Sequence, residues 1–320
     1  MFRAGAECRE TGSVLQFKCD WCKPYGYWNR VNVIKKCLSC DSAFIGPQWD
    51  CPQCGSVPQK LEGFLSFAAE LSQTTENYDA NRYEAIAAVE HQHFWFKGRN
   101  KIIAWALEKF YPQATSLLEV GSGTGQVLHH IAANRPKLRL VGTEIHVRGL
   151  EYSHHRLPNV EFLQMDAGAI PYADEFDVIC AFDVIEHIDR DDQVLNQMHQ
   201  ACRTGGGIVI TVPQYRWLWS SRDYFAHHKR RYQRRELEEK VWNAGFTPVA
   251  TTSFVSLLLP VMYVSRLWER VSDKFSPERE LSIHPLLNRI FFALMRFEYA
   301  LIRCGISLPF GASLMLIARK

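Results

Sequence analysis

The chain has 320 residues, more than a typical single domain, so we expect a main domain of about 200 residues or more with an appendage. Its 47% hydrophobic and 22% charged residues are typical of an ordinary globular protein, and a formal net charge of +3 is too small to imply a polyanionic partner. The chain starts without an apolar stretch of signal-peptide length and contains no run of about 18 apolar residues, so we expect a cytoplasmic protein.

The first 60 residues are rich in cysteine. Six of the ten cysteines form three C-x-x-C pairs before residue 55, which favours a metal in a reducing compartment over disulfides. The last two pairs resemble the knuckles of a zinc ribbon, and four thiolates fill a structural Zn²⁺ site without an open position. These ligands would be Cys37, Cys40, Cys51 and Cys54. Free or redox-active thiols are the alternative. Cys19 and Cys22 could form a second, incomplete site or an alternative ligand set.

After this zinc-ribbon-like domain over residues 1–60, we expect a linker and helix over 61–92 and a larger domain over 93–320. Helical spacing runs from about 78 to 111, where a residue before proline ends it. Apolar strands then alternate with helices, which predicts a parallel sheet covered on both faces. Strands are predicted at 116–121, 138–144, 160–165, 176–182, 207–212, 247–254 and 313–318. Helices are predicted at about 125–134, 147–156, 191–203 and 234–244.

The pattern therefore predicts an α/β fold, a Rossmann-like doubly wound sheet of seven strands. Residues 256–311, before the last strand, have helical apolar spacing and are predicted to be a helical insertion. The simplest interpretation of this insertion is additional core and interface. It could also cover an apolar, lipid-like acceptor or contact a membrane peripherally.

A glycine loop follows the first strand of the sheet, in “LLEVGSGTG” at 117–125. Its glycines are spaced G-x-G-x-G, whereas a dinucleotide-binding loop has G-x-G-x-x-G, and the third position of that pattern is Gln126 here. Glu119 lies on the strand just before the loop, where a carboxylate disfavours a pyrophosphate and favours a cation. The loop therefore indicates a positively charged ligand.

The next two predicted strands also end in acids. Glu144 lies where a carboxylate accepts hydrogen bonds from the two hydroxyls of an adenosine ribose. Asp166 and Ala167 follow the third strand, where a carboxylate and a backbone N–H could bind adenine. Each acid alone could simply cap a helix. Because all three follow successive strands at one edge, together they predict a cationic adenosyl ligand.

These motifs, with “FDVICAFDVIEHI” and “GGGIVITVP”, resemble those of class I S-adenosylmethionine-dependent methyltransferases over about residues 85–320. “VIEHI” is similar to the ubiquinone-biosynthesis type of O-methyltransferase. The resemblance implies S-adenosylmethionine as cofactor and a site at Glu119, Gly121, Ser122, Gly123, Gly125, Glu144, Ile145, Asp166, Ala167 and Asp183. The helical insertion departs from the minimal pattern of the family, so the acceptor is not carried over.

The segment “HFWFKGRN” at 93–100 precedes the first strand of the sheet. In related methyltransferases this segment folds over the cofactor, which implies that Trp95 faces the sulfonium by cation–π attraction and that Arg99 pairs with the cofactor's carboxylate. The alternative is an aromatic helix face packed on the sheet.

Three candidate catalytic residues follow the fourth and fifth strands. His187 comes after the fourth strand and has the pKa range of a base near neutrality, although it could instead only hold its loop by a hydrogen bond. His228 and Tyr232 lie in the stretch that usually covers the acceptor. The basic run over 229–235 could bind an anionic acceptor or be a solvated helix start.

The predicted function is methyl transfer to a small-molecule acceptor, expected at oxygen. An RNA methyltransferase is the first alternative, because zinc ribbons and basic runs often contact nucleic acid. The low net charge and the lack of an N/D-P-P-aromatic motif after the fourth strand argue against nucleic acid. The second alternative is an interaction protein that retains the methyltransferase fold without catalysis.

Overall fold

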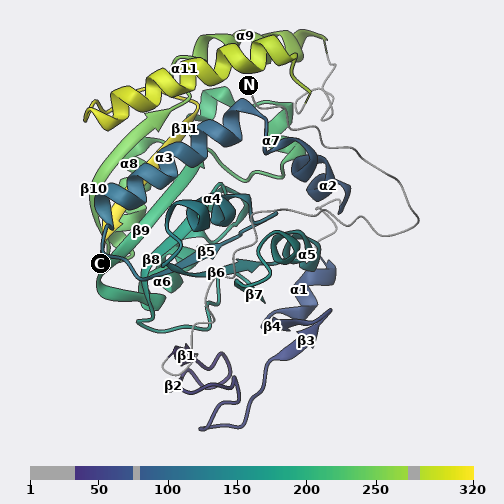
Figure 1. Ribbon diagram of the computed structural model, residues 1–320, viewed down its shortest axis with the longest axis vertical. Helices are drawn as coiled ribbons and strands as arrows, with labels where there is room; N and C mark the ends of the chain where they lie inside the picture. The colour runs from purple at the N-terminus through teal and green to yellow at the C-terminus, as the bar shows by residue number, and fades with distance from the viewer. Residues whose placement is uncertain (1–32, 75–79, 273–281) are drawn as a thin grey trace, which may run out of the picture.

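The structure, a computed structural model, describes residues 33–74, 80–272 and 282–320 (Figure 1). The strands are β1 (Ile34–Lys36), β2 (Ala43–Ile45), β3 (Gln59–Leu61), β4 (Phe64–Ser66), β5 (Ser116–Val120), β6 (Arg139–Glu144), β7 (Glu161–Gln164), β8 (Phe176–Phe182), β9 (Cys202–Pro213), β10 (Thr247–Phe254) and β11 (Ser313–Arg319). The α-helices are α1 (Ala69–Thr74), α2 (Ala80–Val89), α3 (Phe94–Phe110), α4 (Gln126–Asn134), α5 (Val147–Arg156), α6 (Asp191–Ala201), α7 (Ser221–Phe225), α8 (Arg234–Asn243), α9 (Leu259–Ser272) and α11 (Pro285–Arg303). Two short 3-10 helices, η1 (Ile185–His187) and η2 (Arg216–Leu218), follow β8 and β9.

The central sheet contains all seven predicted strands, as β5 to β11. Its order is β10-β11-β9-β8-β5-β6-β7-β4-β3. The strands from β9 to β7 are parallel, whereas β11 lies antiparallel between β9 and β10. Every residue of β5 is buried, as its unbroken apolar pattern predicts for a strand covered on both faces. The Rossmann-like α/β prediction is confirmed.

Two short strands, one across the predicted boundary at residue 60 and one in the predicted linker, extend the sheet to nine strands, where we predicted seven. β4 pairs parallel with β7, with Leu65 opposite Leu163, and β3 pairs antiparallel with β4. The side-chain amide of Gln164 fixes this edge, because its Oε1 accepts from Ser66 Oγ at 2.6 Å and its Nε2 donates to Ala68 O at 2.8 Å. Three-residue strands with mixed composition have no detectable period, which is why the sequence pattern missed them.

The helices cover the sheet on both faces and enclose two apolar cores. One core lies under α6 and α8, and the other under α3, α4, α5 and the predicted insertion. Among the described residues the insertion contains α9 and α11, and α11 packs on α3, where the Cα of Gly98 lies so close to Met295 that a Cβ would be 2.5 Å from its Cε. The helical pattern over 78–111 is divided into α2 and α3, and His93 caps α3 by accepting from Trp95 N.

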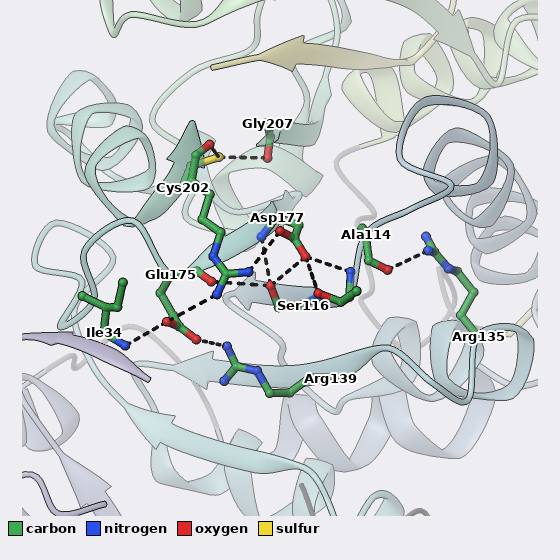
Figure 2. A network of polar contacts seen from close by, with 11 residues as sticks. Ile34, Ala114, Ser116, Arg135, Arg139, Glu175, Asp177, Cys202 and Gly207 are labelled. Atoms are coloured by element: carbon green, nitrogen blue, oxygen red, sulfur yellow. Dashed lines mark hydrogen bonds and ion pairs between the residues drawn. The ribbon is translucent and has the colours of Figure 1, made fainter. Parts of the chain in front are cut away.

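The cysteine-rich segment packs against the loop that joins β7 to β8. In β1, Lys36 N donates to Pro171 O at 3.0 Å and Ile34 N donates to Glu175 Oε2 at 2.8 Å. Figure 2 shows Glu175 between Ile34 and Arg139, with which it forms an ion pair. Trp49 is buried against Tyr172 of the same loop, with ring centroids 5.4 Å apart. The appendage and the sheet therefore share one apolar core.

Candidate active site

The glycine loop leaves β5 in a conformation that few other residues adopt. Gly121, Gly123 and Gly125 have φ of 70°, 53° and 72°, in the left-handed region. A Cβ on Gly121 would lie 2.5 Å from Val184, and one on Gly125 would lie 2.9 Å from Ser153, so both positions require glycine for space as well. A Cβ on Gly123 would have no atom within 4 Å, so the loop opens outward there.

Glu144, at the end of β6, holds the middle of this loop. Its Oε2 accepts from Gly123 N at 3.0 Å, and its Oε1 accepts from Ile145 N at 2.8 Å. Oε1 also accepts from His146 N at 3.3 Å, so the second lone pair of Oε2 is the one that can still accept a ribose hydroxyl of an adenosine. The structure thus brings four residues of the predicted cofactor site to one edge of the sheet: Ser122, Gly123, Glu144 and Ile145.

Glu119 is buried on β5 beside the loop, with 1% of its surface exposed. Burial raises the pKa of this carboxyl to about 8, and the neighbouring Glu144 adds to the effect while Arg99 opposes it. Among the described residues, Glu119 Oε2 and Ser122 Oγ have no hydrogen-bond partner. Buried polar atoms without partners at an open loop are expected where a polar, cationic ligand binds, so the residues present fit the amino-acid end of S-adenosylmethionine.

Arg99 and Asp183 form an ion pair near this end of the site. Arg99 Nη1 lies 2.5 Å from Asp183 Oδ2, and the guanidinium carbon lies 4.4 Å from the centroid of the Trp95 ring. Asp183 follows β8 with a φ of 58°, a left-handed conformation that turns its side chain away from the strand direction. The predicted Trp95, Arg99 and Asp183 therefore meet, while the neighbouring Phe94 packs on Phe291 of the insertion.

Asp166 and Ala167 follow β7 at the same edge of the sheet, as predicted. Asp166 Oδ1 accepts from Gly168 N at 2.9 Å, and Gln193 Nε2 of α6 donates to Gly168 O at 2.8 Å. Gln164, which precedes them, donates from Nε2 to Ile145 O at 3.0 Å. This buried amide links the loops after β6 and β7, and sequence reasoning missed it because a lone glutamine in an apolar strand carries no spacing signal.

His187 and His228 meet after β8, with ring centroids 4.8 Å apart. His228 Nδ1 lies 2.8 Å from Asp223 Oδ1, and its Nε2 lies 4.0 Å from Glu186 Oε1. Burial alone would raise the pKa of Asp223, but the hydrogen bond with His228 and the charge of Arg231 lower it to about 2. Asp223 is therefore an ionised carboxylate that orients the His228 ring.

Glu186 is fully buried beside these histidines, and neither of its carboxyl oxygens has a hydrogen-bond partner among the described residues. Burial raises the pKa of Glu186 well above its ordinary value, and the charge of Asp183 adds to this. One ligand atom each from Glu186, His187 and His228 lies within 4.8 Å of the others, a nitrogen and oxygen donor set that suits a divalent cation. Glu186 is part of the motif “VIEHI” and could have been proposed from the sequence. Asp223 could not, because no spacing pattern relates it to Glu186 and the fold alone brings the two residues close.

Tyr232 does not join this cluster, contrary to our prediction. It is fully buried, and its hydroxyl donates to Asp191 Oδ2 at 2.7 Å. Burial, together with the Asp191 charge, raises the pKa of Tyr232, so its hydroxyl remains protonated. The residue packs in the core under α6 and α8, because the chain after His228 turns inward to pair with the end of β9.

The basic run over 229–235 is largely occupied by contacts within the protein. Arg231 is buried and donates to Asp223 Oδ1 at 2.7 Å, and Arg230 lies 2.9 Å from Asp191 Oδ1. Arg234 donates to Thr251 O at 2.7 Å. The run therefore fixes the loop before α8, and the predicted anion-binding role is not supported for these arginines.

The four predicted zinc ligands lie together at the tips of two turns. Cys37 Sγ lies 3.6 Å from Cys54 Sγ, and Cys40 Sγ lies 3.7 Å from Cys51 Sγ. A tetrahedral site with Zn–S bonds of about 2.3 Å has sulfur atoms roughly 3.8 Å apart, so the donor set and the spacing both fit Zn²⁺. Cys19 and Cys22 lie outside the described residues.

The glycine loop, the acids at successive strand ends and the Rossmann-like sheet agree with the sequence comparison. Residues 78–251, more than half of the chain, match the family described as “Methyltransferase domain”. The chain belongs to this methyltransferase family. It is an S-adenosylmethionine-dependent methyltransferase.

Several known proteins resemble this methyltransferase. It is 24% identical over 256 residues to the malonyl-[acyl-carrier protein] O-methyltransferase of Methylococcus capsulatus, which covers 75% of this chain and 88% of that protein. It is 31% identical over 108 residues to a phosphatidylethanolamine N-methyltransferase of Cereibacter sphaeroides, covering 29% of this chain and 48% of that protein. Phosphoethanolamine N-methyltransferase 2 of Haemonchus contortus, solved with S-adenosyl-L-methionine, superposes with a TM-score of 0.52 at 16% identity, over 82% of this chain and 61% of that one.

Proposed function

We propose that this methyltransferase transfers the methyl group to an oxygen atom of a small-molecule acceptor bound beside His187 and His228. The observation that carries the proposal is the hydrogen bond between His228 and Asp223, 2.8 Å long, close to the carboxyl end of β8. A hydroxyl acceptor must lose its proton as the methyl group is transferred, and a histidine held by a carboxylate is a suitable base. The name of the Methylococcus capsulatus relative also supports transfer to oxygen.

S-adenosylmethionine, when bound, supplies a methyl group activated by a sulfonium. We assign its amino-acid end to Arg99, Asp183 and Glu119, because a cation and two carboxyl groups complement a zwitterion. We assign its adenosine to Glu144 and to the loop that starts at Asp166. These residues would thus hold both ends of the cofactor, and accurate alignment of acceptor and methyl is the main requirement of this reaction.

His228 is the group that we assign to take the acceptor's proton. Asp223 accepts a hydrogen bond from Nδ1–H, which leaves Nε2 as the basic atom. The nearby Glu186 and His187 could instead hold a divalent cation together with His228, and that cation would lower the pKa of a bound hydroxyl. Both arrangements serve the same oxygen acceptor.

The acceptor is proposed to be a small or lipid-like molecule. The relatives are named for acceptors of this kind: malonyl-acyl-carrier protein, phosphatidylethanolamine and phosphoethanolamine. The internal ion pairs of Arg230 and Arg231 speak against RNA, since these side chains are not available to phosphates. We further propose that Cys37, Cys40, Cys51 and Cys54 hold a structural zinc ion.

The proposal is tested with the full chain and a methyl-labelled cofactor. Binding of S-adenosylmethionine is first measured by calorimetry, and labelled products are then identified by mass spectrometry after incubation with sets of phenols, alcohols, carboxylic acids and amines. We expect cofactor binding and label on an oxygen atom. Label on nitrogen would overturn the assignment of the atom, and a chain that binds no cofactor would favour the interaction-protein alternative.

A further inference from the structure

The helical insertion leaves an apolar face on the outside of the protein. On α9, Trp268 is 74% exposed and Val264 is 64% exposed, and on α11 Leu286 and Phe297 are 59% and 58% exposed. Figure 1 shows both helices together at the end of the molecule that lies farthest from β1 to β4. The exposed apolar side chains of this face, which we call the insertion face, are Leu257, Val261, Val264, Leu267, Trp268, Leu286, Leu287, Ile290 and Phe297. Apolar surface gathered in this way commonly marks an interaction site.

The helices that carry the insertion face are held firmly by their opposite sides. Glu298 of α11 is buried, and its Oε2 accepts from Ser256 N at 2.9 Å and from Leu257 N at 3.2 Å, just before α9. The buried Arg266 of α9 donates to Leu218 O after β9. Because the inner sides supply the contacts with the core, the outward apolar residues stay exposed among the residues that the structure describes.

Three arginines flank the apolar stripe of α11. Arg289, Arg296 and Arg303 recur at every seventh residue, so they lie on one side of the helix, and all three are exposed. The acid within the described α11 is Glu298, which is buried, and residues 259–268 contain no acid. The insertion face thus combines an apolar stripe and a row of cations, the composition of helices that lie in the interface of an anionic membrane.

We infer that the insertion face binds the surface of an anionic lipid bilayer, with α9 and α11 lying along it. Among the residues that the structure describes, no helix is both long enough and apolar enough to cross a membrane, so a position in the plane of the interface is the one that these helices can adopt. The arginines favour an anionic bilayer over a zwitterionic one. Each cation near an anionic surface contributes to binding, whereas a zwitterionic surface attracts a cation only weakly. A second copy of the chain fits less well, since a two-fold contact through this face would bring the same arginine rows together.

An open groove lies at the start of α9, beside the insertion face. Trp217, after β9, packs edge-on against Tyr263 of α9 with ring centroids 5.6 Å apart. These two residues line an open groove with Leu259 and Pro260. The groove would lie at the bilayer surface when the insertion face is bound. Binding of a bilayer by the outer face does not require a particular acceptor.

The experiment is co-sedimentation of the full chain with vesicles of phosphatidylcholine and with vesicles that also contain phosphatidylglycerol. The charge variant is Arg289→Gln with Arg296→Gln and Arg303→Gln, and the apolar variant is Ile290→Ser with Phe297→Ser. A matched control removes three exposed cations elsewhere: Lys60→Gln, Lys137→Gln and Arg190→Gln. Thermal unfolding of each variant checks that the fold is retained.

We expect the protein to pellet with the anionic vesicles and to remain in the supernatant with phosphatidylcholine alone. The charge variant should bind about a hundredfold more weakly, as three lost cations predict, while the control variant binds as the unaltered protein does. The apolar variant should also lose binding at unchanged charge. Equal binding to both vesicles, or equal loss in the charge and control variants, would overturn the inference. A dimer in sedimentation velocity that Phe297→Ser abolishes would assign the face to a second copy instead.

Discussion

Arg99 of α3 and Asp183 after β8 form an ion pair 2.5 Å long across the cofactor end of the sheet, although 84 residues separate them in the chain. The guanidinium is buried, with 7% of the residue exposed, and lies over the Trp95 ring. Paired in this way, the two charges neutralise each other in the structure, and their signs are opposite to those of the amino-acid group that we propose for this end of the cofactor. The pair is therefore matched in charge to an amino-acid group.

Replacing Arg99 should directly weaken binding of the cofactor. We expect Arg99→Gln to raise the Kd of both S-adenosylmethionine and S-adenosylhomocysteine about ten- to a hundredfold, because a hydrogen bond to a charged group contributes about 1.5–3 kcal/mol. Calorimetry measures both affinities. Arg148→Gln, which removes an exposed arginine paired within α5, is the control and should leave the Kd unchanged. Unaltered affinity in Arg99→Gln would contradict the assignment of the cofactor's carboxylate.

Glu119 should make the cofactor-free protein less stable as the pH rises. Its pKa is about 8 in the folded protein and has an ordinary value of 4.5, so the folded state binds the additional proton between these values. Its contribution to the free energy of unfolding is complete below about pH 4.5 and is lost as the pH rises to about 8, with a maximal slope of roughly 1.4 kcal/mol per pH unit. Chemical denaturation of Glu119→Gln should show this slope reduced, since the amide does not titrate.

The same carboxyl should couple cofactor binding to proton release. A bound cation favours ionised Glu119, so affinity for S-adenosylmethionine should increase with pH up to about 8, and binding below that pH should release a proton. Calorimetry in buffers of different ionisation enthalpy measures the protons released. If Glu119→Gln releases as many as the unaltered protein does, another group is responsible.

Replacing His228 should lower the rate of methyl transfer without changing the affinity for the cofactor. We expect His228→Ala to lower the rate of methyl transfer by about a hundredfold or more, since a positioned base contributes about 10²- to 10⁴-fold, while the Kd of S-adenosylmethionine stays within a few-fold. Asp223→Asn should follow the same pattern, because it removes the carboxylate that orients the ring. The exposed His155→Ala on α5 serves as the control. A matching loss of cofactor affinity would instead place His228 in the cofactor site.

Loss of the proposed zinc site should weaken cofactor binding from a distance. The cysteine turns hold β1, and β1 pairs with the backbone around Tyr172 in the loop that begins with Asp166. We expect one zinc ion per chain by elemental analysis. The Cys51→Ser variant should lose this zinc, unfold at a lower temperature and bind S-adenosylmethionine several-fold more weakly. Cys304→Ser, at an exposed cysteine outside the cluster, should change none of these. Full cofactor affinity in the zinc-free protein would show that the two sites are independent.

The features that the sequence pattern predicted well are those with a local cause. Seven strands and their helices follow from apolar periods of two and 3.6 residues, which report burial within one segment. β3 and β4 escaped prediction because a three-residue strand such as Gln59–Leu61 has no period, and the positions of the two strands depend on the pairing of β4 with β7 and of β3 with β4. We assigned Tyr232 to the acceptor site because of its neighbours in the chain. Whether its side chain points into the core or toward the acceptor is decided by the turn after His228.

The cofactor edge follows from local sequence, because the glycines after β5 and the acids at or just after the ends of β5, β6 and β7 are set by their places along the strands, and parallel strands bring those ends together. The pairing of distant side chains depends on the tertiary fold. Asp223 with His228, Arg99 with Asp183, and the cysteine-rich segment with the loop after β7 are contacts between segments whose spacing in the chain carries no period. Such pairs form because burial leaves each charged or polar group few partners, and the fold alone determines which partner is within reach.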